Sequence, residues 1–189
     1  MKSYPILQDD KNASLKNVLD FITRERGNDV NDWNNLSNRF YPIKGVIDNS
    51  DAAAGNVGEY VESIVGSGSA VSLVSVTAKT VTSISLSAGD WDVSGIVGFT
   101  GGSTTTYGQV TASISNTANT HAAAPSGGFV QQTWGGTLPV VGAIGTPSIA
   151  TGLSRVKISA QTTIYLIASA FFTTSTFSAF GTIRARRIR

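Results

Sequence analysis

The sequence predicts a mainly β protein in which antiparallel strands form two packed sheets, preceded by a short helical or extended N-terminal arm. Three observations favour this fold class. Beyond residue 66, apolar and polar residues alternate with period two in short runs that end at Gly, Pro, Ser or Asn. Charged residues make up only 14% of the chain, so Ser, Thr, Gly and Ala fill the surface positions of this region. The first 63 residues differ from the rest in pattern and in charge.

Charge divides the chain into two parts. Residues 1–63 carry ten acidic and seven basic side chains, whereas residues 64–189 carry two acidic and seven basic ones, so the two net charges are −3 and +5. We therefore expect an attachment arm and linker over residues 1–63 and a β-sandwich domain over residues 64–189. A monomer with so few surface charges is poorly protected against association. This favours a β domain whose surface is partly buried against identical copies of the chain. The alternative is a low-charge sandwich that stays alone.

The arm carries two apolar stripes at helical spacing. Residues 13–26 and 29–40 repeat apolar side chains every three or four positions, which places them on one face of a helix. The stripes are Leu15, Val18, Leu19 and Ile22 in the first helix, and Val30, Trp33, Leu36 and Phe40 in the second. An arm of this size cannot bury both stripes within itself. We expect them to dock on another protein; the alternative is that they lie against the chain's own sandwich.

Short strands follow the irregular linker of residues 41–58. The predicted strands are 71–76, 80–87, 89–100, 109–115, 127–133, 154–160, 162–172 and 177–187. Eight antiparallel strands suit a two-sheet jelly roll. In the third of these strands, Trp91 and Val93 share one face while Asp90 and Asp92 share the other. The tryptophan is therefore predicted to lie in the core and both carboxylates outside it.

The strand of residues 162–172 is apolar on both faces. Ile164, Leu166, Ala168 and Phe172 occupy one face, and Tyr165, Ile167 and Phe171 occupy the other. A sandwich strand usually turns one face to water, so a second apolar face indicates either a subunit interface or a fully covered sheet. We expect Tyr165, Ile167 and Phe171 to contact a neighbouring subunit.

Few residues offer catalytic or metal-binding chemistry. His121 is the only histidine, the chain has no cysteine, and the imidazole is expected to be exposed in its loop. We therefore expect no zinc site, no Ser-His-Asp triad and, because no phosphate-binding glycine motif is present, no cofactor. Asp90 and Asp92 lie roughly 7 Å apart on one strand face, a spacing that a glycoside hydrolase could use. Solvation beside a turn explains them better, and no enzymatic activity is expected.

Nucleic acid and membrane are not expected partners. The basic residues 184–189 could meet phosphates, but the rest of the β region has almost no Lys or Arg. Pairing of these arginines with the acidic arm, within or between chains, explains them as well. The longest apolar run, residues 162–172, is about half the length that crosses a bilayer. No apolar segment follows Met1, so we expect no secretory signal and synthesis in the cytosol.

Several stretches resemble tail-fibre and virion appendage proteins of bacteriophages. They are residues 55–61 (Gly-Asn-Val-Gly-Glu-Tyr-Val), residues 80–93 and residues 181–187 (Gly-Thr-Ile-Arg-Ala-Arg-Arg). The likeness covers about residues 45–189 and does not extend to the first 44 residues. Residues 89–93 (Gly-Asp-Trp-Asp-Val) and 175–180 (Ser-Thr-Phe-Ser-Ala-Phe) are also similar to the central and closing strands of trimeric jelly rolls of the C1q and tumour-necrosis-factor type.

The resemblance implies a homotrimeric TNF/C1q-like jelly roll in a phage virion, assembled in the host cytoplasm and anchored to other virion proteins by its arm. It also implies that the loops of residues 101–108, 116–128 and 134–152 contact a host surface glycan. Tyr107, His121 and Trp134 are the candidate contact residues, with core packing as the alternative for Trp134. The rival function is a capsid decoration protein or head fibre that binds the shell and no receptor.

Overall fold

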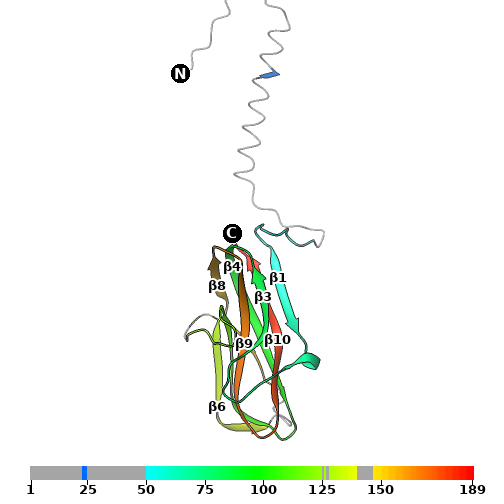
Figure 1. Ribbon diagram of the computed structural model, residues 1–189, viewed down its shortest axis with the longest axis vertical. Coiled ribbons are helices and arrows are strands. Elements are labelled where there is room, and N and C mark those ends of the chain that lie inside the picture. Colours follow the sequence, from blue (N-terminus) through cyan, green and yellow to red (C-terminus); the bar gives the residue numbers. More distant parts are fainter. Residues whose placement is uncertain (1–22, 25–49, 125, 127, 140–146) are drawn as a thin grey trace, which may run out of the picture. The chain divides into compact units, whose positions relative to one another are not determined.

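The computed structural model describes residues 23–24, 50–124, 126, 128–139 and 147–189. Residues 48–189 form one compact unit, whose described part is a sandwich of two antiparallel β-sheets (Figure 1). This architecture confirms the predicted fold class, a mainly β, jelly-roll-like sandwich.

The docking residues predicted in the arm lie outside the described residues. They are Leu15, Val18, Leu19, Ile22, Trp33, Leu36 and Phe40. Thr23 and Arg24, which are described, are helical and exposed. The docking role of the arm therefore stays a prediction from the sequence.

The first sheet has the strand order β1-β10-β4-β7. Strand β1 spans Tyr60–Val65, β10 spans Phe177–Arg187, β4 spans Gly89–Gly101 and β7 spans Ser148–Ala150. Two short strands extend its edges: β2 (Val71–Ser72) also pairs with β10, and β8 (Ser154–Ile158) also pairs with β4. One turn of 3-10 helix, Ser67–Ser69, separates β1 from β2. The sheet thus has four strand positions across its width.

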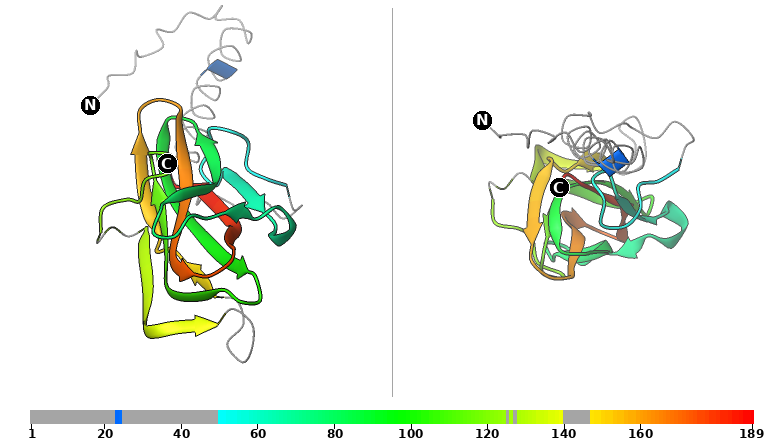
Figure 2. Two further views of the ribbon diagram at one scale, coloured as in Figure 1. Left: turned by 60° about the horizontal axis from the view of Figure 1, so that its bottom comes forward. Right: turned by 90° about the horizontal axis from the view of Figure 1, so that it is seen from above.

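The second sheet has the strand order β3-β9-β5-β6. Strand β3 spans Lys79–Leu86, β9 spans Thr162–Thr173, β5 spans Thr106–Ser115 and β6 spans Phe129–Pro139. Consecutive strands such as β3 and β4, or β9 and β10, lie in opposite sheets, as they do in a jelly roll. Figure 2 shows the sandwich tilted so that its lower end comes forward and, in the second view, from above.

Each predicted strand overlaps an observed one, whereas β1 and β7 have no predicted counterpart. Strand β1 reads Tyr-Val-Glu-Ser-Ile-Val, which places apolar residues on both faces and obscures the alternation. It pairs in register with β10, so the predicted division between residues 63 and 64 falls inside a strand. The predicted strand of residues 71–76 is too long, because β2 ends at Ser72 and the chain turns at Val76, where φ is +56°.

The core lies between the sheets and contains a cluster of aromatic rings. The ring of Phe177 lies 5.6 Å from that of Phe99, 5.5 Å from that of Tyr107 and 5.4 Å from that of Phe172, measured between centroids. Trp91 is fully buried, as the alternation along β4 predicts. Burial of aromatic rings contributes strongly to stability, so this cluster is the main apolar centre of the sandwich.

Candidate functional surfaces

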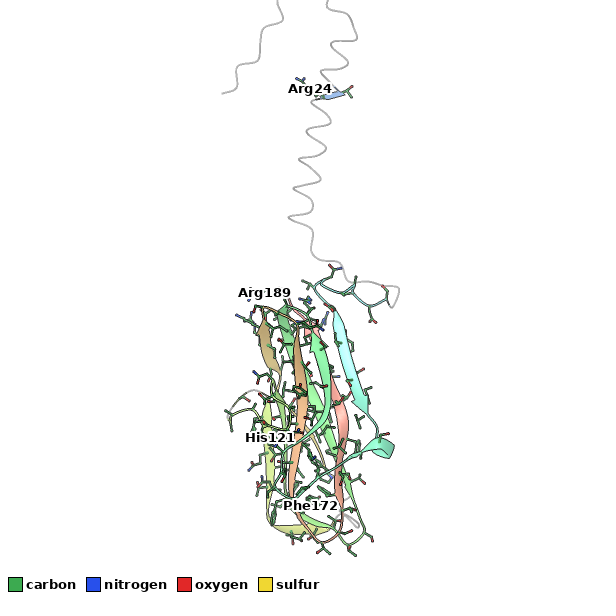
Figure 3. The ribbon with its side chains drawn as sticks, viewed as in Figure 1. Arg24, His121, Phe172 and Arg189 are labelled. Carbon is green, nitrogen blue, oxygen red and sulfur yellow. The ribbon has the colours of Figure 1, made fainter. Side chains whose placement is uncertain are left out.

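The polar chemistry of the sandwich gathers in two places. Figure 3 shows Arg189 at the end of the sandwich where the chain finishes, Phe172 toward the opposite end and His121 between them. A cluster of ion pairs lies around Arg189, and a loop fixed by His121 covers part of the second sheet. The same loop borders a cavity.

Arg187, near the end of β10, is the centre of the ion-pair cluster. Its side chain is only 5% exposed, and its Nε donates a hydrogen bond to Glu59 Oε2 at 2.8 Å. The guanidinium also donates to the carbonyl oxygen of Ala88 and the hydroxyl of Ser87. Its carbon lies 4.3 Å from the centroid of the Trp91 ring, the geometry of a cation–π contact. One side chain thus joins the segment before β1, the β3–β4 turn and the core.

Glu59 is fixed from its other side as well. The backbone N–H of Gly55 donates to Glu59 Oε2 at 2.8 Å, and this hydrogen bond, together with Arg187, lowers the pKa of the carboxyl group below its usual value. The backbone adds two hydrogen bonds, from Gly58 N to Arg187 O and from Arg187 N to Glu59 O, both 2.9 Å. Glu59 belongs to the acidic residues 1–63, so pairing of the basic tail with that segment within one chain is confirmed.

Asp90 forms the second part of the cluster. It accepts hydrogen bonds from Arg155 Nε at 2.8 Å and Arg189 Nε at 2.9 Å. The bonds from Arg155 and Arg189 lower the pKa of Asp90 far below its usual range. The side chain faces outward, as predicted, but the residue is 7% exposed and ion-paired rather than solvated. A carboxylate held in its ionised form cannot act as a general acid near neutral pH.

His121 fixes the loop that follows β5, described over residues 116–124, to the outer face of the second sheet. Its Nδ1 lies 2.8 Å from Ser113 Oγ of β5, and its Nε2 lies 2.8 Å from Ser169 Oγ of β9. The ring meets that of Phe129 edge-on, with 5.9 Å between centroids. Burial lowers the pKa of the imidazole. The prediction of an exposed loop histidine is therefore wrong, because both ring nitrogens are engaged by the sheet beneath.

The same loop explains the second apolar face of β9. Ile167 is fully buried although its side chain points away from the core. Its neighbours across the sheet are Thr80 of β3 and Ser113 of β5. Asn119 exchanges two hydrogen bonds with Thr80, at 2.9 and 3.0 Å, and His121 bonds Ser113. The loop therefore crosses above Ile167, and its burial requires no neighbouring subunit.

The other two predicted interface residues are more accessible. Phe171 is 42% exposed, and Tyr165 is half-buried. Together with the covered Ile167, they do not form a continuous apolar face.

The remaining predicted contact residues, Tyr107 and Trp134, lie on strands rather than in loops. Tyr107 of β5 is fully buried, so the prediction that it contacts a receptor is wrong. Its ring packs between those of Phe177 and Trp134, the latter edge-on with 5.1 Å between centroids. Trp134 of β6 is half-buried against the core, which favours the packing alternative for this side chain.

A cavity of about 530 Å³ lies between the loop and strand β8. Its floor is formed by Ile114 of β5 and Ile164 of β9, and Val156 and Ile158 of β8 add apolar surface. Hydroxyl and amide side chains of the loop form the opposite wall. The sequence pattern indicates the loop but not the cavity, because the cavity depends on how the loop packs against the sheet.

No group of three or more His, Asp or Glu side chains among the described residues could hold a metal ion. None of the helical residues described belongs to a helix long and apolar enough to cross a membrane.

No family model matches the chain, and no curated protein matches it. Among solved structures, the VP2 subviral particle of infectious bursal disease virus is similar at 12% identity with a TM-score of 0.39, covering 78% of this chain and 37% of that one. The Gx strain of the same virus is similar at 14% identity with a TM-score of 0.34, covering 77% and 36%. The chain thus spans little more than a third of these proteins. At these TM-scores the likeness bears on neither function nor assembly.

Proposed function

We propose that the chain is a non-enzymatic structural protein of a bacteriophage particle, a homotrimeric tail-fibre or tail-tip appendage. The observation that carries the proposal is the arrangement of the two ends of the sandwich. The ion pair between Glu59 and Arg187 fixes the segment before β1 to the end where the chain finishes. The β4–β5 and β9–β10 loops, which meet through the hydrogen bond from Gly102 N to Thr176 O, lie at the opposite end. The end at Arg187 is thus suited to attachment to the virion, and the end with the β4–β5 and β9–β10 loops is suited to contact with the host surface.

The outer face of the first sheet supports self-association. Ile64 of β1 and Ile96 of β4 are 66% and 41% exposed, and they flank Thr182 of β10 in one cross-strand row. Apolar side chains gathered on a sheet face are typical of a protein interface. In the proposed homotrimer this row contacts a neighbouring copy.

The partners follow from the same arrangement. The arm attaches the trimer to other virion proteins, and the distal loops contact a host surface glycan. Nucleic acid is not a proposed partner, because Arg187 and Arg189 of the basic tail are engaged by Glu59 and Asp90. The protein acts without catalysis or cofactor, and it reaches the virion from the host cytoplasm.

Incorporation into particles tests the proposal. A variant with both Leu19→Ala and Trp33→Ala should still fold and assemble but should be depleted from purified particles, because interface anchors of this kind commonly contribute more than about 1 kcal/mol each. Wild-type occupancy of the double variant would contradict the role of the arm. A capsid decoration protein, the alternative, would change the stability of the shell and leave host adsorption intact.

A further inference from the structure

The cavity beside β8 borders a strand edge that pairs with no other strand in the described part of the chain. All five residues of β8, Ser154–Ile158, line it, although side chains along a strand point alternately to opposite faces. A cavity that touches every residue of a strand must face its edge. The other edge of β8 pairs with β4, so backbone N–H and C=O groups of β8 are directed toward the cavity.

The side chains around the cavity favour a polar ligand that carries negative charge. Seven of them bear a hydroxyl or an amide: Ser115, Asn116, Thr117, Thr120, Ser126, Ser154 and Thr162. Arg155, Lys157 and His121 also line the cavity, and no Asp or Glu does. An anion therefore meets no carboxylate among the lining residues. Asp90, the cross-strand partner of Lys157, lies close by but is ion-paired with both Arg155 and Arg189.

Lys157 is the cation best placed to act on a ligand. Arg155 is engaged by Asp90, and His121 is engaged by two serines. Lys157 is exposed and forms no ion pair with another of the described residues. The hydroxyl of Ser126 likewise makes no hydrogen bond within the described part of the chain. Neither group has to leave a partner among the described residues in order to bind a ligand.

We propose that this cavity binds an acidic saccharide, with the carboxylate of the sugar near Lys157 and its hydroxyls on the serine and threonine wall and the edge of β8. Its volume of about 530 Å³ lies within the range of small-ligand sites. Hydroxyl and amide groups donate and accept hydrogen bonds, as sugar hydroxyls do, so seven such side chains match a saccharide better than a peptide. The apolar floor receives the C–H face of a sugar ring.

This inference rests on the proposed function and deepens it by naming the class of host glycan that the particle contacts. Binding is measured on the purified full-length protein, whereas the virion role is measured by incorporation into particles. Failure of the proposed saccharide binding is therefore distinguishable from failure of the proposed virion role.

The test is isothermal titration calorimetry with tetragalacturonate, whose four sugars each carry a carboxylate, and with its uncharged methyl ester. The wild type should bind the acid more tightly than the ester. Lys157→Gln should weaken binding of the acid about fivefold to tenfold, the usual range for a charge-assisted contact. Lys79→Gln is the matched control, because Lys79 of β3 does not line the cavity. Ser126→Trp should abolish binding by filling the cavity while the circular dichroism spectrum stays unchanged.

Several results would overturn the proposal. If Lys157→Gln and Lys79→Gln weaken binding of the acid equally, the binding reflects general attraction of a polyanion to a chain whose isoelectric point is about 9.0. If the wild type binds the ester as tightly as the acid, the charge of the ligand plays no role in binding. If a folded Ser126→Trp variant binds as well as the wild type, the ligand binds outside the cavity. An oligoglutamate that displaces the saccharide and depends equally on Lys157 would make the cavity a peptide site.

Discussion

Replacing Arg187 by alanine tests whether one buried side chain holds the segment before β1 to the sandwich. The side chain is 5% exposed and that of Glu59 is 13% exposed, so the change leaves a carboxylate largely without its partner in a site that water reaches poorly. Removing one member of a buried ion pair costs about 3–5 kcal/mol. The cation–π contact with Trp91, which contributes about 0.5–2 kcal/mol, is one part of that cost. We expect Arg187→Ala to lower the free energy of unfolding by about 3–5 kcal/mol.

The neighbouring Arg186→Ala variant is the matched control. Arg186 is exposed and forms no ion pair with a described residue, so its removal should change the free energy of unfolding by less than about 0.5 kcal/mol. Arg187→Lys should fall between the two, because lysine keeps the charge but lacks the planar fork that reaches Glu59, Ser87 and Ala88 together.

Equilibrium unfolding in urea, followed by tryptophan fluorescence, measures all three variants. Limited proteolysis adds a local measurement, since Arg187→Ala should speed cleavage around Gly55–Gly58 by releasing Glu59. Equal stability of the Arg187→Ala and Arg186→Ala variants would refute the reasoning, because the buried ion pair of Arg187 would then contribute no more to the free energy of unfolding than an exposed arginine does.

Three further outcomes follow from the structure. Phe177→Ala should lower the free energy of unfolding by about 3–5 kcal/mol, measured in urea, because three rings lose their common neighbour; a loss under about 1 kcal/mol would contradict its central place. Burial lowers the pKa of His121 below 6.5, so the unfolded chain binds the proton more readily than the folded chain. This contribution to stability should be fully present above pH 6.5 and decrease as the pH falls below 6.5. His121→Gln should flatten this pH dependence in thermal unfolding scans, and an unchanged profile would exclude the imidazole as its cause. Ile64→Lys with Ile96→Lys should convert the proposed trimer to monomers in sedimentation velocity, whereas an unaltered trimer would place the interface elsewhere.

The strands could be predicted because their alternation is local. Trp91 alternates with Asp90 and Asp92 along β4, and this pattern alone indicates which side chain enters the core. Strand β1 escaped prediction because apolar residues occupy both of its faces, and only its register with β10 shows that it belongs to the sheet.

The functional surfaces depend on contacts between distant residues, which the sequence does not encode locally. The two-sided apolarity of β9 indicates that its outer face is covered, but a subunit and the chain's own loop produce the same pattern. At Ile167 the cover is the chain's own loop, because Asn119 and His121 of that loop form hydrogen bonds to strands 39 and 48 residues away in the sequence. Tyr107 follows a Gly- and Thr-rich stretch that reads as a loop, although β5 already begins at Thr106.

The location of the protein on phage particles tests the proposed function most directly. Electron microscopy of particles labelled through an antibody to the sandwich should show label on projecting appendages of the tail. A variant that lacks residues 1–40, where the sequence predicts the arm helices, should be absent from these appendages. Label spread over the capsid shell would favour the decoration protein instead. Purified particles that carry no label, with the protein present only in the lysed host, would contradict a structural role in the virion.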